Sequence, residues 1–303
     1  MARVAVLTDS TASVPASTAT DWGIHVVPLR LGLDGGADHP DDARSREELA
    51  IALRAGGTAT TSQPSQAALT EAMTAAGQDA EAVVALHLSA ELSGTVGVAR
   101  RAAAEVAALG GPPVHVVDTR TVAGGLGFAA VAAARQAAAG APVERVLAHA
   151  RATAARATVL FAVPELQYLA RGGRIGPARA FLGSALGARP ILAVGGGVLT
   201  VLETTRGLAR VHRRIAEIAV RAAGGPGADT PRGAGGPVQL AVHHFAAPEA
   251  ADDLAELLEQ RLAETGAQVV RLVRSEVSAV IGAHTGPGVV GVAVAPAEPS
   301  PSP

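Results

Sequence analysis

Five consecutive residues of this chain combine side chains that can bind an anion. The segment 61–65 reads Thr-Ser-Gln-Pro-Ser and supplies three hydroxyl groups and one amide. Gln63 precedes a proline, which disfavours helical backbone, whereas Pro64 suits the first turn of a helix. We therefore predict a turn that opens a helix, where free N–H groups and neutral hydroxyls can hold a carboxylate or a phosphate. Ordinary N-capping by Ser62 or Ser65 is the alternative use of these residues.

Polar side chains also follow three predicted strands in the first half of the chain. The continuous apolar run at 4–7 is typical of a buried parallel strand, and further strands are predicted at 82–88 and 114–117. Hydroxyl or carboxyl groups come soon after each of them. Because ligands bind beyond the carboxyl ends of parallel strands, we expect one crevice to collect these groups. The candidates at these strand ends are Ser10, Ser93, Thr95 and Asp118.

Three further candidates carry nitrogen groups. His284 lies within Gly-Ala-His-Thr-Gly-Pro-Gly, residues 282–288, which predicts a loop fixed by glycine and proline from which an imidazole can reach a ligand. Arg174 follows two glycines, which predict a tight bend that projects the guanidinium, with a simple helix C-cap as the alternative. Arg206 opens a predicted basic helical stretch, a pattern typical of a solvated face.

The composition argues against several classes of partner. A net charge of -2 with one Trp, one Tyr and four Phe offers neither a basic footprint nor stacking platforms, so we expect no nucleic acid. The sequence contains no lysine, which excludes a P-loop, and the glycines at 124, 125 and 127 lack the dinucleotide-binding spacing. Because His243 and His244 are adjacent on a predicted strand, they face opposite sides, and we expect no metal site.

The absence of cysteine excludes disulfides and thiolate chemistry. Together with an N-terminus that begins directly in a strand pattern, this favours a cytoplasmic location. The longest apolar stretches, such as residues 128–134, are too short to cross a bilayer, so we expect no membrane span.

A chain of 303 residues with 49% hydrophobic content is long enough for two hydrophobic cores. Strands and helices alternate over residues 1–157, which predicts an N-terminal α/β domain with a parallel sheet. A second α/β domain is expected over 158–295, where two apolar runs flank the glycines at 195–197 and indicate a hairpin, hence a mixed or antiparallel sheet. Residues 223–237 lack apolar bulk and are predicted to be a disordered loop, and 296–303 a disordered tail.

Taken together, these motifs resemble the DegV family, the bacterial fatty-acid-binding proteins that serve as the lipid-carrying subunit of fatty acid kinase. The resemblance spans nearly the whole chain, and several short motifs in the same order are more specific than any one of them. The motifs lie at residues 9–12, 61–65, 92–95, 118–119, 125–127, 169–176, 190–192, 206 and 284–288.

The resemblance implies two α/β domains with one long-chain fatty acid in a buried tunnel between them. Thr61 and Ser93 would hydrogen-bond the carboxylate, with Ser62 near them and His284 close by at the domain interface. The chain would need no cofactor and would not itself be a catalyst.

The resemblance also implies a partner. The bound carboxylate would be presented to a separate ATP-dependent kinase subunit for acyl-phosphate formation, in phospholipid metabolism, and Arg174 and Arg206 would contact that subunit. Transient contact with a membrane surface would exchange the lipid. The chain departs from the family pattern at Ala90, Val96 and Pro177, which affects the chain preference and the partner contact rather than the carboxylate site.

Two other functions stay open from the residues alone. A serine hydrolase or esterase would use Ser93 or Ser62 as nucleophile and His284 as base, although neither serine lies in a Gly-x-Ser-x-Gly motif. A small phospho-ligand-binding α/β protein would need more positive charge than these strand ends provide. Identification of any lipid carried by the purified protein distinguishes the three.

Overall fold

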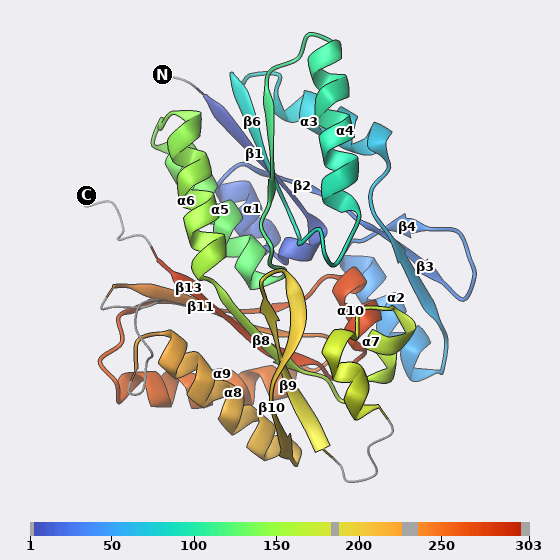
Figure 1. Ribbon diagram of the computed structural model, residues 1–303, viewed down its shortest axis with the longest axis vertical. Coiled ribbons are helices and arrows are strands. Elements are labelled where there is room, and N and C mark those ends of the chain that lie inside the picture. Colours follow the sequence, from blue (N-terminus) through green and yellow to red (C-terminus); the bar gives the residue numbers. More distant parts are fainter. Residues whose placement is uncertain (1–2, 183–187, 226–235, 298–303) are drawn as a thin grey trace.

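The computed structural model describes residues 3–182, 188–225 and 236–297, which form two α/β halves. The N-terminal half is uppermost in Figure 1 and the C-terminal half lies beneath it. The strands of the described residues belong to a four-stranded, a three-stranded and a six-stranded sheet. The proposed domain boundary between residues 157 and 158 falls between the last helix of the upper half and the first strand of the six-stranded sheet.

The N-terminal half is built on a parallel sheet in the order β2-β1-β6-β7, as predicted. The apolar runs form its buried strands, and every residue of β6 is buried. Helices α3 and α4 cover one face, while α5 and α6 cover the other (Figure 1). The strands are Val4–Asp9 (β1), Ile24–Val27 (β2), Ala82–His87 (β6) and Val114–Asp118 (β7). The helices are Ser10–Ala12 (η1), Ala16–Asp21 (α1), Gln66–Ala76 (α3), Thr95–Ala108 (α4), Gly124–Ala138 (α5) and Val143–Arg156 (α6).

A small antiparallel sheet in the order β4-β3-β5 carries the segment singled out above. The predicted helix-opening turn at 61–65 is only partly correct, because Thr61 and Ser62 are the last residues of β5. Ser65 is the N-cap of α3, and its Oγ accepts a hydrogen bond from the N–H of Ala68 at 3.1 Å. These elements are Arg30–Leu33 (β3), His39–Pro40 (β4), Ala59–Ser62 (β5) and Ala43–Arg54 (α2).

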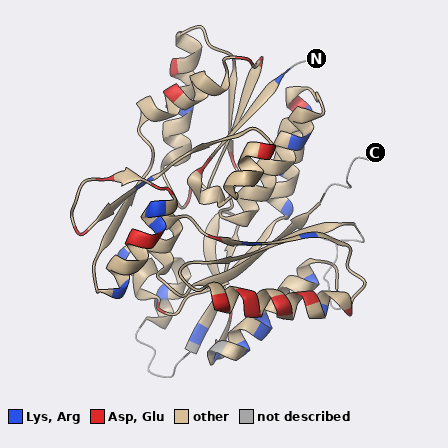
Figure 2. Cartoon of the chain, turned by 180° about the vertical axis from the view of Figure 1, so that it is seen from behind, with Lys and Arg blue, Asp and Glu red and all other residues tan. Residues whose placement is uncertain are grey.

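The C-terminal half is built on a mixed sheet in the order β10-β9-β8-β13-β11-β12, in which only β11 and β12 are parallel. Helices α8 and α9 pack against one face, and the red segments of Figure 2 mark acidic residues along α9. Phe128 of α5 packs on the other face, which is turned towards the N-terminal half. The strands are Thr158–Ala162 (β8), Ala188–Gly195 (β9), Val198–Arg206 (β10), Val238–His244 (β11), Val269–Glu276 (β12) and Val290–Pro296 (β13). The helices are Gln167–Arg171 (α7), Gly176–Phe181 (η2), Leu208–Ala222 (α8), Pro248–Ala263 (α9) and Ala279–Thr285 (α10).

Both predictions of disorder need correction at their edges. Residues 223–225 complete the end of α8, because the N–H of Gly225 donates to the carbonyl of Val220 at 2.9 Å. Pro296 belongs to β13 and pairs with Val238, so the predicted tail begins with an ordered residue. Pro237 is also ordered, because its carbonyl accepts a hydrogen bond from the N–H of Ala297 at 2.8 Å. Residues 226–235 of the predicted loop and 298–303 of the predicted tail lie outside the described residues.

Among the helices that the structure describes, none combines the length and the apolar character needed to cross a bilayer.

Candidate functional site

A cavity of about 130 Å³ lies between the two halves. Its volume corresponds to on the order of ten water positions, so it is large enough for a ligand rather than a single water. Most of its walls are apolar, and a few polar groups converge on it, a combination typical of small-molecule sites. Apolar residues of the wall include Leu29, Leu88, Val122, Val159, Phe161, Leu169, Leu199, Val280 and Val292.

Thr61 and His284 form a polar pair in the cavity wall and come from opposite halves of the chain. The Thr61 Oγ1 lies 2.9 Å from Nε2 of His284, within hydrogen-bond distance. Thr61 reaches this position from the end of β5, and His284 reaches it from the last turn of α10. The prediction of a Gly/Pro loop at His284 is therefore wrong: the N-cap Ser278 starts a short helix, and the glycine-rich part begins only at Gly286.

Two glycines leave the room that this arrangement needs. Gly286 ends α10 with a φ of 77°, and a Cβ on it would collide with the ring of Tyr168. Gly172 packs directly against the imidazole of His284, so that a Cβ there would overlap Nδ1. Gly172, the first of the two glycines before Arg174, thus makes space for His284.

The imidazole of His284 is neutral at physiological pH. Burial, and then the nearby positive charge of Arg174, lower the pKa of His284 to about 4. Its Nδ1 is buried and has no hydrogen-bond partner among the described residues. In the tautomer with a proton on Nε2, the imidazole donates to Thr61 Oγ1, and the threonine hydroxyl proton is free to donate to a ligand.

Ser93 also lines the cavity, at the start of α4. Its Oγ lies 2.9 Å from Oγ1 of Thr95 and accepts a hydrogen bond from the N–H of Thr95 at 3.3 Å. Ser62 lines the cavity as well, although its Oγ donates outward to Asp38 Oδ2 at 3.0 Å. The structure therefore gathers the four primary candidates of the sequence around one cavity.

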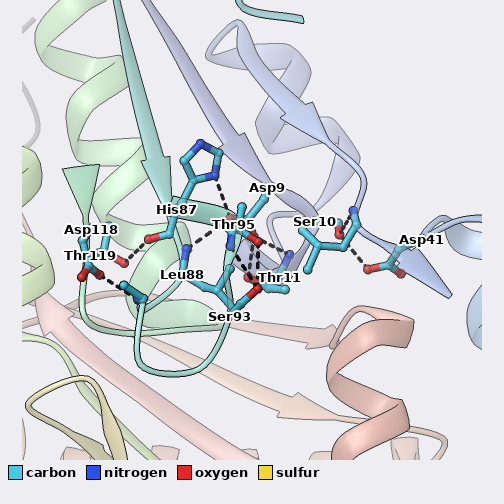
Figure 3. Close-up of polar contacts among 12 residues, drawn as sticks. Asp9, Ser10, Thr11, Asp41, His87, Leu88, Ser93, Thr95, Asp118 and Thr119 are labelled. Carbon is cyan, nitrogen blue, oxygen red and sulfur yellow. Dashed lines mark hydrogen bonds and ion pairs between the residues drawn. The ribbon is translucent and has the colours of Figure 1, made fainter. Parts of the chain in front are cut away.

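The three secondary candidates are not among the residues that line the cavity. Ser10 Oγ donates to the carboxylate of Asp41 at 2.7 Å, and Asp118 Oδ1 accepts from the N–H of Arg120 at 2.9 Å. Thr95 is fully buried and contacts Ser93 through its hydroxyl. Figure 3 places Ser10 and Asp118 on opposite sides of the strand ends, so these groups support the loops around the cavity rather than sharing one crevice.

A buried hydrogen bond between Asp9 and His87, which sequence reasoning missed, fixes the same strand ends. The carboxylate of Asp9 accepts from His87 Nδ1 at 3.0 Å and from the N–H of Leu88 at 3.1 Å, and the side chains of Asp9 and His87 are fully buried (Figure 3). Asp9 also accepts from the N–H of Thr11 at 3.1 Å, and Thr11 lines the cavity. Asp9 was visible in the sequence as a strand-end carboxylate, but its pairing partner depends on the contact between β1 and β6.

Arg174 bridges the two halves at the edge of the cavity. Its Nε donates to the carbonyl of Leu92 at 3.1 Å, and its Nη1 donates to the carbonyl of Gly172 at 2.6 Å. Arg206 is exposed and does not line the cavity. The prediction that Arg206 opens a helix is wrong, since it is the last residue of β10 and α8 starts at Leu208.

The fold and this site define a class: two α/β halves that enclose an apolar ligand cavity with hydroxyl and imidazole groups at one part of its wall. The chain belongs to the DegV family, because the family model described as "Uncharacterised protein, DegV family" matches residues 3–297.

Relatives and solved structures agree over nearly the full length. A DegV domain-containing protein of Streptomyces coelicolor is 43% identical, with 96% of this chain and 98% of the relative covered. One from Mycobacterium tuberculosis is 36% identical, with 96% of each chain covered. These matches confirm the family resemblance.

Two solved structures confirm the fold class. A DegV family protein from Thermus thermophilus, described as binding fatty acid, is similar with a TM-score of 0.85, 31% identity, and coverage of 97% of this chain and 100% of that chain. DegV of Bacillus subtilis, described as a fatty acid binding protein, has a TM-score of 0.81, 28% identity, and coverage of 98% and 100%.

Proposed function

We propose that this protein binds one long-chain fatty acid, with the hydrocarbon in the cavity between the halves and the carboxylate against Thr61 and Ser93. The observation that carries this proposal is the contrast within one cavity between a mainly apolar wall and the Thr61–His284 pair. The fatty acid binding described for the Thermus and Bacillus proteins supports it. We propose that the cavity is part of a buried tunnel that opens at Arg174.

The energetics favour a tail-driven complex. A chain of about 16 carbons contributes on the order of 12 kcal/mol of gross burial at roughly 0.8 kcal/mol per methylene, before association and ordering reduce it. The head group therefore needs orientation more than attraction. Among the described residues that line the cavity, Arg174 alone carries a full positive charge, whereas the groups proposed to hold or flank the carboxylate, Thr61, Ser93 and His284, are neutral.

We further propose that the bound carboxylate is the nucleophile of a phosphoryl transfer catalysed by a separate kinase subunit. A carboxylate oxygen would attack the γ-phosphorus of ATP, form the acyl–phosphate bond and release ADP. Neutral hydroxyl donors leave that oxygen electron-rich, whereas an arginine clamp would withdraw density. This chain would present the substrate without being a catalyst, and Arg174 and Arg206, which are both exposed, would contact the kinase.

The hydrolase alternative lacks support from the site. Ser93 Oγ pairs with Thr95 and Ser62 Oγ with Asp38, while Nε2 of His284 pairs with Thr61. Neither serine therefore contacts the His284 imidazole, which this alternative assigns as the base. The phospho-ligand alternative would require more than the single guanidinium that lines the described cavity.

A binding titration separates these functions. We expect delipidated protein to bind palmitate at one site per chain, and to yield palmitoyl phosphate when ATP and the cognate kinase subunit are added. Hydrolysis of a p-nitrophenyl ester with no palmitate binding would favour the esterase. Phosphate binding with no palmitate binding would favour the phospho-ligand protein.

The proposal also includes a cytoplasmic location, a place in phospholipid metabolism and lipid exchange at a membrane surface. Cosedimentation with lipid vesicles that contain fatty acid, followed by transfer of the acid to the protein, would test the exchange step.

A further inference from the structure

His243 stands between two cavities. It is the single residue that the described linings of the main cavity and of a second cavity of about 30 Å³ have in common. The side chain is 6% exposed and lies on β11. The second cavity is largely apolar, and its lining includes Val14, Gly127, Phe128, Val131 and Ala241. The imidazole of His243 is thus a partition.

The ring is held firmly in this position. Its Nδ1 lies 3.1 Å from Oγ of Ser275 on the neighbouring strand β12. On the opposite side Nε2 faces Gly124 at the start of α5, where an added Cβ would lie 2.6 Å from that nitrogen. Nε2 has no hydrogen-bond partner among the described residues. Burial lowers the pKa of His243 to about 4, so the partition is uncharged at physiological pH.

The strand order gives an approximate separation between this partition and Leu199, at the Arg174 end of the cavity. Leu199 of β10 lines the cavity together with Arg174, whereas His243 lies on β11. The order β10-β9-β8-β13-β11 contains four interstrand steps, which span about 19 Å at about 4.8 Å each. An extended hydrocarbon advances about 1.25 Å per carbon, because bonds of about 1.5 Å meet at near-tetrahedral angles. By the same spacings, an acyl chain of about 15 carbons would span the cavity from Leu199 to His243.

We propose that His243 closes the inner end of the fatty acid cavity and sets the longest acyl chain that the protein accepts. This inference rests on the proposed fatty acid binding and adds the residue that determines the length. A longer chain would have to displace the imidazole from its contacts with Ser275 and Gly124, or leave its terminal carbons outside. Removing the ring would join the main cavity to the second one.

The test compares His243→Ala with wild type over saturated fatty acids from myristate to behenate. In wild type, affinity should rise with length and then level off. In the alanine variant, the length at which it levels off should increase by about two carbons or more, and each newly buried methylene should favour binding about fourfold. His243→Ser serves as a second variant if the alanine variant does not fold.

Two controls separate the steric partition from other effects. His243→Phe keeps a ring of similar shape without the nitrogens, so its length limit should match that of wild type. His212→Ala, on α8 and outside both described linings, should leave the limit unchanged. An unchanged limit in both small variants of His243 would overturn the inference, as would a phenylalanine variant that behaves like alanine. If wild type binds no fatty acid at all, the proposed function fails instead.

Discussion

Replacing Thr61 by valine removes one hydroxyl and nearly keeps the shape of the side chain, and we expect it to loosen the fatty acid without emptying the protein. A hydrogen bond to a charged group contributes about 1.5–3 kcal/mol, so losing it should raise the Kd about 10- to 150-fold. The gross burial term of the tail, on the order of 12 kcal/mol, is several times larger. Part of the lipid should therefore remain bound.

The same substitution also acts on the fold. Thr61 is the partner of His284 Nε2 at 2.9 Å, and Nδ1 of that ring has no partner in the described structure. Leaving a buried polar group unsatisfied costs about 1–3 kcal/mol, so the free energy of unfolding should fall by that amount. Phosphoryl transfer should fall further than binding, because a carboxylate displaced by about 1 Å can lose on the order of a hundredfold in rate.

The assay is a titration of delipidated protein with palmitate and with its methyl ester, which lacks the charged group. Thr60→Val is the matched control, since Thr60 lies on the same strand, is exposed and does not line the cavity. We expect Thr61→Val to weaken binding of the acid and to leave binding of the ester close to wild type. Equal loss for acid and ester, or no loss for the acid, would refute the placement of the carboxylate at Thr61.

Three further predictions concern the surroundings of His284. Replacing Arg174 by alanine should lower acyl-phosphate formation by the kinase subunit about tenfold or more, while bound lipid per chain stays the same. Gly172→Ala places a methyl group against Nδ1 of His284 and should weaken palmitate binding about tenfold, whereas Gly97→Ala on α4, where a Cβ meets little, should have no effect. The folded-state pKa values of His284 and His243 lie near 4, below the usual 6.5, so the unfolded chain takes up their protons first. The free energy of unfolding, measured by urea titration, should therefore decline as the pH falls from 6.5 towards 4, by up to about 3 kcal/mol per histidine.

Each of these has an outcome that contradicts it. Loss of lipid from Arg174→Ala would mean that the guanidinium belongs to the binding site. Wild-type palmitate affinity in Gly172→Ala would mean that the position of the imidazole does not matter for the acid. A urea midpoint that changes equally with pH in wild type and in His243→Phe would show that the buried His243 imidazole does not couple folding to pH.

Local patterns were sufficient to predict the parallel sheet of the N-terminal half. Continuous apolar runs such as the one that forms β6 have few other uses, and a strand end with hydroxyl groups after it is a local feature. The hairpin around residues 195–197 was equally clear, because three glycines separate two apolar runs. The four primary candidates came from short motifs in a fixed order, and all four line the cavity.

What depended on distant pairing could not be predicted. Thr61 is part of a strand because residues 59–62 pair with residues 30–33, and no sequence pattern near Thr61 predicts that pairing. His284 ends a helix of only seven residues, too short for a helical period to stand out beside the glycines and proline that follow it. His243 was correctly placed on a strand, but its position between two cavities follows from how β11 and α5 meet.

The most direct test of the central proposal is native mass spectrometry of the wild-type protein purified from a bacterial host, followed by denaturation and identification of what is released. We expect an intact mass that exceeds that of the polypeptide by one long-chain fatty acid, and release of about one equivalent of fatty acid per chain on denaturation. The proposed fatty acid site would be contradicted if the intact mass equals that of the polypeptide and the protein takes up no palmitate after incubation. Release of only traces of mixed lipid would contradict it as well.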